Sequence, residues 1–166
     1  MINETFKAAC VQNCAGTDME ANLADTEALV RYAASQGASL ICLPEFFSCL
    51  ELRDGTFEIG DRIEDEHPGL PVVQRLAEEL KVWVQMGSLA IRSPAGKIHN
   101  RAYTIGSNGE IVAFYDKIHL FDVDLTNGER YRESETVEPG ALAVTAETPW
   151  GTLGLSVCYD LRFARL

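Results

Sequence analysis

The sequence has 166 residues, a length typical of one domain with a substantial core. Hydrophobic residues make up 46% and charged residues 23% of the chain, and these globular values exclude a disordered tail, a collagen-like repeat and a coiled coil. Asp and Glu number 25 against 14 Lys and Arg, and the resulting net charge of −11 excludes nucleic acid and an anionic membrane surface as expected partners.

The first part of the chain has the pattern of a strand–helix–strand unit. Residues Phe6–Gln12 are predicted to form a buried strand, and Asp18 is placed to cap a helix that runs to about Gln36. The short apolar segment Ser39–Leu43, ended by Pro44, predicts a second buried strand. A βαβ unit of this kind favours the α/β class.

The remainder of the chain is rich in predicted strands. The stretch Glu51–Glu66, with seven acidic and two basic residues, is predicted to be a solvated loop, and a helix follows at Leu70–Leu80. Strands are predicted at Val82–Ile91, Arg101–Ile105, Glu110–Tyr115, Ala141–Glu147 and Thr152–Cys158. This order indicates a layered α/β sandwich rather than a helix bundle.

The five cysteines have spacings that match neither a zinc site nor a redox motif, and they are Cys10, Cys14, Cys42, Cys49 and Cys158. We therefore expect free thiols, no metal and a cytoplasmic location. The N-terminal residues lack the pattern of a signal peptide, and no apolar stretch approaches the about 20 residues of a membrane span. No phosphate-binding glycine motif is present, so nucleotide binding is unsupported.

Cys158 is the strongest candidate for a nucleophile. It ends the apolar run Leu153–Val157, and a helix-like segment follows, so the pattern predicts a strand that turns tightly into a helix. Amides at the start of such a helix favour a thiolate. An ordinary thiol, with a pKa of about 8.5, is a few per cent ionised at neutral pH, so a lowered pKa or a neighbouring base is needed. A buried structural cysteine is the alternative.

Two further residues have the chemistry that such a nucleophile requires. Glu45 follows Pro44 at the carboxyl end of a predicted strand, where its apolar neighbours suit a general base; a surface carboxylate is the alternative. Lys117 lies in the alternating segment Tyr115–Phe121 and is suited to hold an oxyanion; a protective lysine on an edge strand is the alternative. His119 is the competing base, in a Cys–His dyad.

Three segments together resemble the signature segments of the nitrilase superfamily of carbon–nitrogen hydrolases. They occur in the same order, at Leu43–Phe47, Tyr115–Phe121 and Cys158–Phe163. The resemblance implies an α-β-β-α sandwich and a catalytic triad. In that triad Cys158 is the nucleophile, Glu45 the general base and Lys117 the cationic stabiliser.

The same resemblance implies two supporting residues. A second glutamate near the site corresponds to Glu133, with Glu135 as the weaker choice. The backbone N–H of Tyr159 is implied to join Lys117 in holding the oxyanion. No metal or organic cofactor is implied.

Within the superfamily, the segments His119–Asp124 and Arg132–Ser134 look most like the omega-amidase and deaminated glutathione amidase branch. That branch removes a terminal amide from small dicarboxylic monoamides, with a cysteine thioester and release of ammonia. Asp116 and Ala164 depart from its usual pattern. A nitrilase or an N-carbamoyl amidase is the nearer alternative, and an inactive fragment or a non-enzymatic scaffold is the alternative of another class.

The superfamily pattern continues beyond Leu166. We therefore expect residues 1–166 to be a single carbon–nitrogen hydrolase domain that is incomplete at the C-terminus. The expected partner is a small amide substrate, with no nucleic acid and no membrane. For the full-length protein, the resemblance implies a homo-oligomer.

Overall fold

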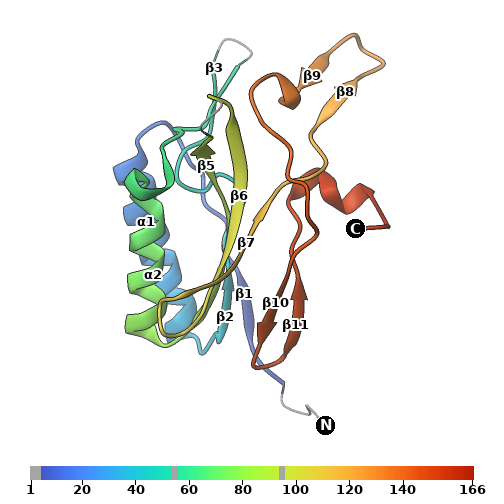
Figure 1. Cartoon of the computed structure of the whole chain (residues 1–166). Coiled ribbons are helices and arrows are strands. Elements are labelled where there is room, and N and C mark those ends of the chain that lie inside the picture. Colours follow the sequence, from blue (N-terminus) through green and yellow to red (C-terminus); the bar gives the residue numbers. More distant parts are fainter. Residues whose placement is uncertain (1–4, 54–55, 94–95) are drawn as a thin grey trace.

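The computed structural model describes residues 5–53, 56–93 and 96–166 and has a mixed five-stranded sheet at its centre (Figure 1). The strand order is β1 (Ala8–Cys10), β2 (Leu40–Cys42), β5 (Trp83–Arg92), β6 (Ile98–Ile105) and β7 (Ile111–Asp116). The first three strands are parallel, and β5, β6 and β7 are antiparallel. The predicted α/β class is confirmed.

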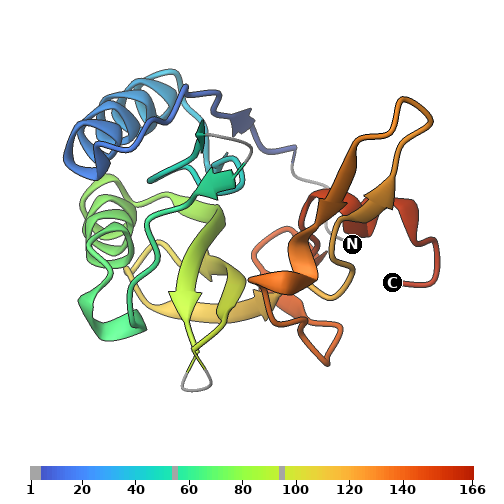
Figure 2. The ribbon, with the colours of Figure 1, turned by 90° about the horizontal axis from the view of Figure 1, so that it is seen from above.

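Two helices cover one face of this sheet (Figure 2). They are α1 (Met19–Ser35) and α2 (Gly69–Leu80), and each connects two parallel strands. The predicted cap of α1 is confirmed, because the Asp18 side chain accepts a hydrogen bond of 3.1 Å from the Ala21 backbone N–H. No helix in the described part of the chain is both long and apolar enough to span a membrane.

Three small hairpins and three 3₁₀ helices complete the described residues. The hairpins are β3 (Glu51–Arg53) with β4 (Thr56–Glu58), β8 (Asp122–Asp124) with β9 (Arg130–Arg132), and β10 (Thr145–Thr148) with β11 (Gly151–Gly154). The 3₁₀ helices are η1 (Glu64–Glu66), η2 (Glu133–Glu135) and η3 (Cys158–Arg162). In Figure 1, β8–β11 lie across the sheet from the two α-helices.

The core is divided between the two faces of the sheet. Among the described residues, eighteen buried side chains between the helices and the sheet form the main cluster, and Ala102, Tyr115, Leu155 and Val157 form a second cluster on the other face. Because side chains alternate along a strand, the split runs through β6: Tyr103 belongs to the main cluster and its neighbour Ala102 to the second.

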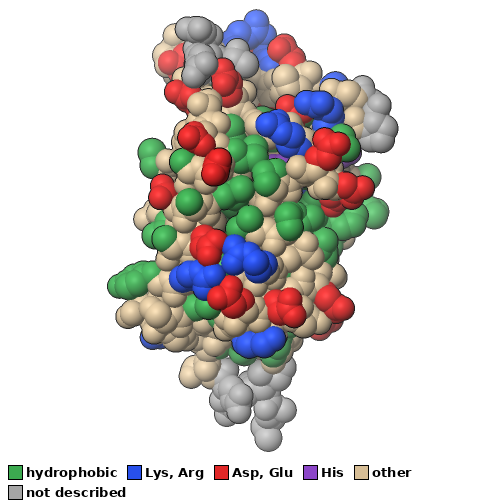
Figure 3. Space-filling model, turned by 90° about the vertical axis from the view of Figure 1, so that its left-hand side faces the viewer, with side chains coloured by type: hydrophobic (Ala, Val, Ile, Leu, Met, Phe, Trp, Pro, Cys, Tyr) green, Lys and Arg blue, Asp and Glu red, His purple; other side chains and the backbone are tan. Residues whose placement is uncertain are grey.

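The helical face that points away from the sheet carries ion pairs (Figure 3). Arg31 of α1 contacts both carboxylate oxygens of Glu79 of α2, at 2.9 and 2.8 Å. Arg75 of α2 reaches back to Glu27 of α1 at 2.7 Å. These exposed pairs join the two helices above the apolar contact that buries their inner faces.

Two glycines allow backbone segments to approach each other closely. An added Cβ at Gly87 of β5 would lie 2.1 Å from the Pro44 carbonyl oxygen, and one at Gly140 would lie 2.1 Å from the carbonyl oxygen of Asp116. Any larger residue would displace the segments that precede Glu45 and Lys117.

Several expectations from the sequence are wrong in detail. The strand expected to be buried at Phe6–Gln12 is the short edge strand β1, exposed at Ala8 and Cys10, because a single neighbouring strand covers it. The expected loop Glu51–Glu66 contains β3, β4 and η1, and its residues 54–55 lie outside the described residues. The alternating segment Tyr115–Phe121 is extended only at its start, because β7 ends at Asp116, and the helix predicted after Cys158 is a single 3₁₀ segment.

Candidate functional site

Lys117 is the centre of a buried polar cluster. Its side chain is 2% exposed, and Nζ lies 3.2 Å from Glu45 Oε1 and 2.9 Å from Glu133 Oε2. Burial acts to lower the pKa of Lys117, but the charge of Glu45, with the hydrogen bond and charge of Glu133, outweighs it and holds the pKa above its ordinary value. The ammonium is therefore charged at neutral pH.

The backbone fixes Lys117 on both sides. Its N–H donates to the Asn100 carbonyl at 3.0 Å, which continues the β6–β7 register one pair beyond Asp116, and its carbonyl accepts from the Gly140 N–H at 2.9 Å. Lys117 therefore lies opposite Asn100, on the face of the sheet that carries Ala102 and the second cluster.

Glu45 projects from a strained turn that follows β2. The next residue, Phe46, has a φ of +48°, and its N–H donates to the hydroxyl oxygen of Ser88 at 3.1 Å. A bulky residue in the left-handed region costs energy and persists where the surroundings fix it. Here burial of Phe46 and Phe47, 8% and 1% exposed, supplies that constraint.

Glu133 of η2 contacts the same ammonium. Its Oε2 also accepts a hydrogen bond of 2.6 Å from the Phe121 N–H, which fixes the carboxylate from the segment that follows Lys117. Glu135, the weaker choice, is exposed. The structure thus brings Glu45, Lys117 and Glu133 together, although they are far apart in sequence.

Asn100 of β6 is a further member of this cluster. It is 0% exposed, and its Nδ2 lies 2.6 Å from Glu45 Oε1 and 3.5 Å from Glu133 Oε1. Its Oδ1 is buried without a hydrogen-bond partner among the described residues. Sequence reasoning missed Asn100, because a single Asn within a strand carries no motif.

Cys158 is exposed and begins η3 with a φ of +50°, so the tight turn that the sequence predicts is present. Its partial burial, then the charge of Glu45 and a hydrogen bond with that carboxylate, raise the pKa of the thiol, although the Lys117 charge acts to lower it. The charges of Glu45 and Lys117 therefore both act on this thiol, in opposite directions.

Asp160 holds the turn at Cys158 in place through hydrogen bonds. Its side chain is fully buried, and Oδ2 accepts from the Tyr115 hydroxyl at 2.7 Å and from the Val157 N–H at 2.9 Å. Oδ1 accepts from the His119 N–H at 2.9 Å. Burial acts to raise the pKa of Asp160, but these hydrogen bonds outweigh it and hold the pKa below its usual range. The sequence feature that could have indicated this role is the acidic residue two positions after Cys158.

His119, the competing base, is engaged with the same carboxylate. Its Nδ1 lies 2.8 Å from Asp160 Oδ1, and its ring stacks on Phe163 with 3.7 Å between centroids. Tyr159 contributes its ring to a neighbouring aromatic contact, with its centroid 5.2 Å from that of Phe121 in an edge-to-face arrangement.

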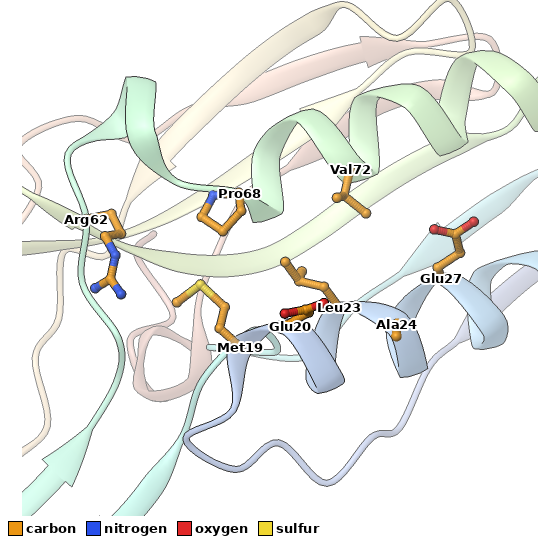
Figure 4. Close-up of a pocket in the computed structure, with 8 residues that line it drawn as sticks. All are labelled: Met19, Glu20, Leu23, Ala24, Glu27, Arg62, Pro68 and Val72. Carbon is orange, nitrogen blue, oxygen red and sulfur yellow. The ribbon is translucent and has the colours of Figure 1, made fainter.

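A separate hollow of about 520 Å³ lies between α1 and α2 (Figure 4). Its lining residues are Met19, Glu20, Leu23, Ala24, Glu27, Arg62, Pro68 and Val72, and none belongs to the Lys117 cluster. Within residues 5–53, 56–93 and 96–166, no group of three or more His, Cys, Asp or Glu side chains has an arrangement suited to a metal ion.

Comparison with known proteins matches residues 7–166 to the carbon–nitrogen hydrolase family model. The omega-amidase NIT2 of Mus musculus is 35% identical over 164 residues, which are 98% of this chain and 58% of that protein. The deaminated glutathione amidase of Yersinia enterocolitica is 37% identical over 161 residues, 95% of this chain and 56% of that protein. The chain therefore spans little more than half the length of these relatives.

Solved structures of other proteins have a similar fold. The Caenorhabditis elegans NitFhit protein superposes with a TM-score of 0.79 and 27% identity, covering 94% of this chain and 38% of that one. Saccharomyces cerevisiae Nit3, described as a member of branch 10 of the nitrilase superfamily, has a TM-score of 0.71 at 24% identity, covering 90% of this chain and 53% of that one.

Proposed function

The chain belongs to the carbon–nitrogen hydrolase family, and on this premise we propose that the protein hydrolyses a small amide through a cysteine thioester. The observation that carries the proposal is the buried Lys117 ammonium, held between Glu45 and Glu133, with Cys158 near enough for the charges of Glu45 and Lys117 to act on its thiol. In the proposed reaction Cys158 is the nucleophile, Glu45 the base and Lys117 the fixed cation.

In the first half of the reaction, Glu45 accepts the proton of Cys158 as the sulfur attacks the amide carbonyl. Lys117 and the Tyr159 backbone N–H hold the oxyanion, and loss of one such donor typically costs about 2.7–4 kcal/mol in the transition state. The tetrahedral intermediate collapses, the C–N bond breaks, and the leaving nitrogen takes the proton from Glu45 and departs as ammonia. The acyl group remains on Cys158 as a thioester.

In the second half, Glu45 accepts a proton from water, and the resulting hydroxide attacks the thioester. The C–S bond breaks, the carboxylic acid is released, and Glu45 returns a proton to the sulfur. Glu133 touches no reacting atom in this scheme. Its role is to hold the Lys117 ammonium in place with two contacts, at 3.1 and 2.9 Å.

We propose a substrate with a terminal amide on a small dicarboxylic acid, because the similar proteins include an omega-amidase and a deaminated glutathione amidase. The test is ammonia release from α-ketoglutaramate and from deaminated glutathione. We expect Cys158→Ala to abolish it, and Glu45→Gln to lower it by at least about 100-fold. No ammonia from any short amide would refute the amidase proposal.

Further substrates and variants separate the alternatives. Turnover of nitriles or N-carbamoyl amino acids in place of amides would assign another branch of the superfamily. Activity that is lost in His119→Ala and retained in Glu45→Gln would assign a Cys–His dyad. A Cys158 thiol that is alkylated no faster than an ordinary exposed thiol would favour the non-enzymatic scaffold.

We also propose a cytoplasmic protein that acts as a homo-oligomer. The free cysteines support a reducing compartment. Exposed apolar side chains such as Leu142 and Leu161, 73% and 80% exposed, support association with further protein. Light scattering of the purified protein tests the proposed homo-oligomer, since the mass of a monomer would contradict it.

A further inference from the structure

We propose that Asn100 is a positioning residue that aims the carboxylate of Glu45 at Cys158. The inference rests on the proposed function, in which Glu45 is the general base. It goes beyond the triad because Asn100 is neutral, lies on another strand and touches no reacting atom.

The first support is the choice of oxygen. Asn100 Nδ2, at 2.6 Å, and Lys117 Nζ, at 3.2 Å, contact the same atom, Glu45 Oε1. Two donors on one oxygen fix the plane of the carboxyl group. The other oxygen, Oε2, is then the one left to accept the proton from Cys158.

The second support is the orientation of the amide. Reversal of the Asn100 side chain would place its carbonyl oxygen against the Glu45 and Glu133 carboxylates, where like partial charges repel. The observed orientation satisfies both acids but leaves Oδ1 buried without a partner among the described residues. A buried carbonyl that loses its hydrogen bonds costs about 1–3 kcal/mol. For an Asn with a purely structural role, this orientation brings a cost and no benefit. For an Asn that positions the Glu45 carboxylate, the orientation is required.

The third support is the chemistry of the cycle. In the proposed reaction Lys117 also holds the oxyanion, so its ammonium divides its hydrogen bonds between the oxyanion and the two glutamates at the moment when the base must stay in place. Asn100 has no such second task. Its N–H can donate to Oε1 of the carboxylate and also to Oε1 of the carboxylic acid that forms after proton transfer. An Asp at this position would instead add a third negative group beside Glu45 and Glu133.

The experiment compares two variants of similar volume, Asn100→Leu and Asn100→Asp, with a matched control. The control is Thr104→Val, which removes a buried polar group from the same strand. Thr104 is 0% exposed and donates to Gln85 Oε1 at 2.6 Å, away from the acids. Thermal unfolding of all three variants reports the structural cost of each change.

We expect kcat for amide hydrolysis to fall about 10- to 100-fold in both Asn100 variants, with KM changed less than threefold, because a misaimed base slows the chemical step. Thr104→Val keeps the kcat and KM of the parent, even if its melting temperature falls.

A second readout separates this inference from the proposed function. Alkylation of Cys158 by iodoacetamide needs the Glu45–Cys158 contact but no amide turnover, and we expect it to slow in both Asn100 variants at pH 7. If the parent protein releases no ammonia, the proposed function fails and alkylation alone decides. Unchanged alkylation in the Asn100 variants, or a loss that Thr104→Val reproduces, would overturn the positioning role.

Discussion

The carboxylate of Asp160 is the structural support of the turn that carries Cys158. It is fully buried, and the Tyr115 hydroxyl, the Val157 N–H and two groups of His119 contact its two oxygens. An amide at this place would turn an N–H₂ group toward at least one backbone N–H. The residue therefore works as an acceptor on both sides, which Asp alone among residues of its size provides.

We expect Asp160→Asn to lower the free energy of unfolding by about 2–4 kcal/mol, because it removes charge-assisted hydrogen bonds and leaves a buried donor unpaired. Urea unfolding measures the loss, and alkylation of Cys158 should slow in parallel. Asp122→Asn is the control, because Asp122 accepts from Ser134 at the surface. Equal stability of the two variants would contradict the supporting role.

We expect His67 to make the stability of the protein sensitive to mild acid. It is 1% exposed, its Nδ1 accepts the Gly69 N–H at 3.1 Å at the start of α2, and its Nε2 is buried without a partner among the described residues. Burial, and then the charge of Arg62, lower its pKa from 6.5 to about 4. The unfolded chain therefore binds the proton first. Stability is complete above pH 6.5 and falls as the pH drops toward 4.

The predicted loss from this histidine is up to about 3 kcal/mol between pH 6.5 and 4. His67→Asn keeps an acceptor at the start of α2 but cannot titrate, so its stability should vary less over this range. Urea unfolding at a series of pH values measures the difference. His99→Asn is the control, because that histidine is 21% exposed. The same slope for His67→Asn and the parent protein would contradict the prediction.

At the scale of elements, the helices and the central strands were predictable because their signals are local. The Asp18 cap and the apolar spacing predict α1, and β5 and β7 match their predicted segments within about one residue. The hairpins β3–β4 and β8–β9 were missed, because strands of three charged or mixed residues have no period to detect. Their formation depends on pairing rather than on local preference.

The residues of the candidate site also fall into those that the sequence could predict and those that it could not. Glu45, Lys117, Cys158 and Glu133 belong to segments with a family resemblance, and ion pairs join Lys117 to Glu45 and Glu133 in the structure. Asn100 was beyond reach from sequence, because its importance arises from register: it lies opposite Lys117 through a backbone hydrogen bond of 3.0 Å. A register between strands is a tertiary property that no local pattern contains.

The close approach of β5 to the segment before Glu45 depends on Gly87. A Cβ at Gly87 would meet the carbonyl oxygens of Pro44 and Leu43 at 2.1 and 2.3 Å. We expect Gly87→Ala to cost about 2–3 kcal/mol of stability and to slow Cys158 alkylation, because relief of the clash displaces Glu45. Gly154→Ala is the control, with no atom within 4 Å of its added carbon. A Gly87→Ala variant as stable and reactive as this control would refute the argument.

At the scale of the whole molecule, the two faces of the central sheet are unequally packed. In the part of the chain that the structure describes, the cluster beneath the helices has eighteen buried residues and the one beneath β10–β11 has four. Local opening is easiest where few apolar contacts close it. We expect amide hydrogens of β10 and β11 to exchange at least about 10-fold faster than those of β5 and β6, as measured by mass spectrometry. Equal protection of the two regions would contradict this.

The order of the site residues along the chain has a consequence for biosynthesis. Glu45, Lys117 and Glu133 all leave the ribosome before Cys158, which at about 5–20 residues per second appears roughly 10 s after Glu45. The central strands β1–β7, which end at Asp116, therefore have time to pair before Cys158 emerges. In the proposed function, the thiol then emerges beside a general base that is already positioned, which shortens the period in which it meets cellular electrophiles as an unassembled cysteine.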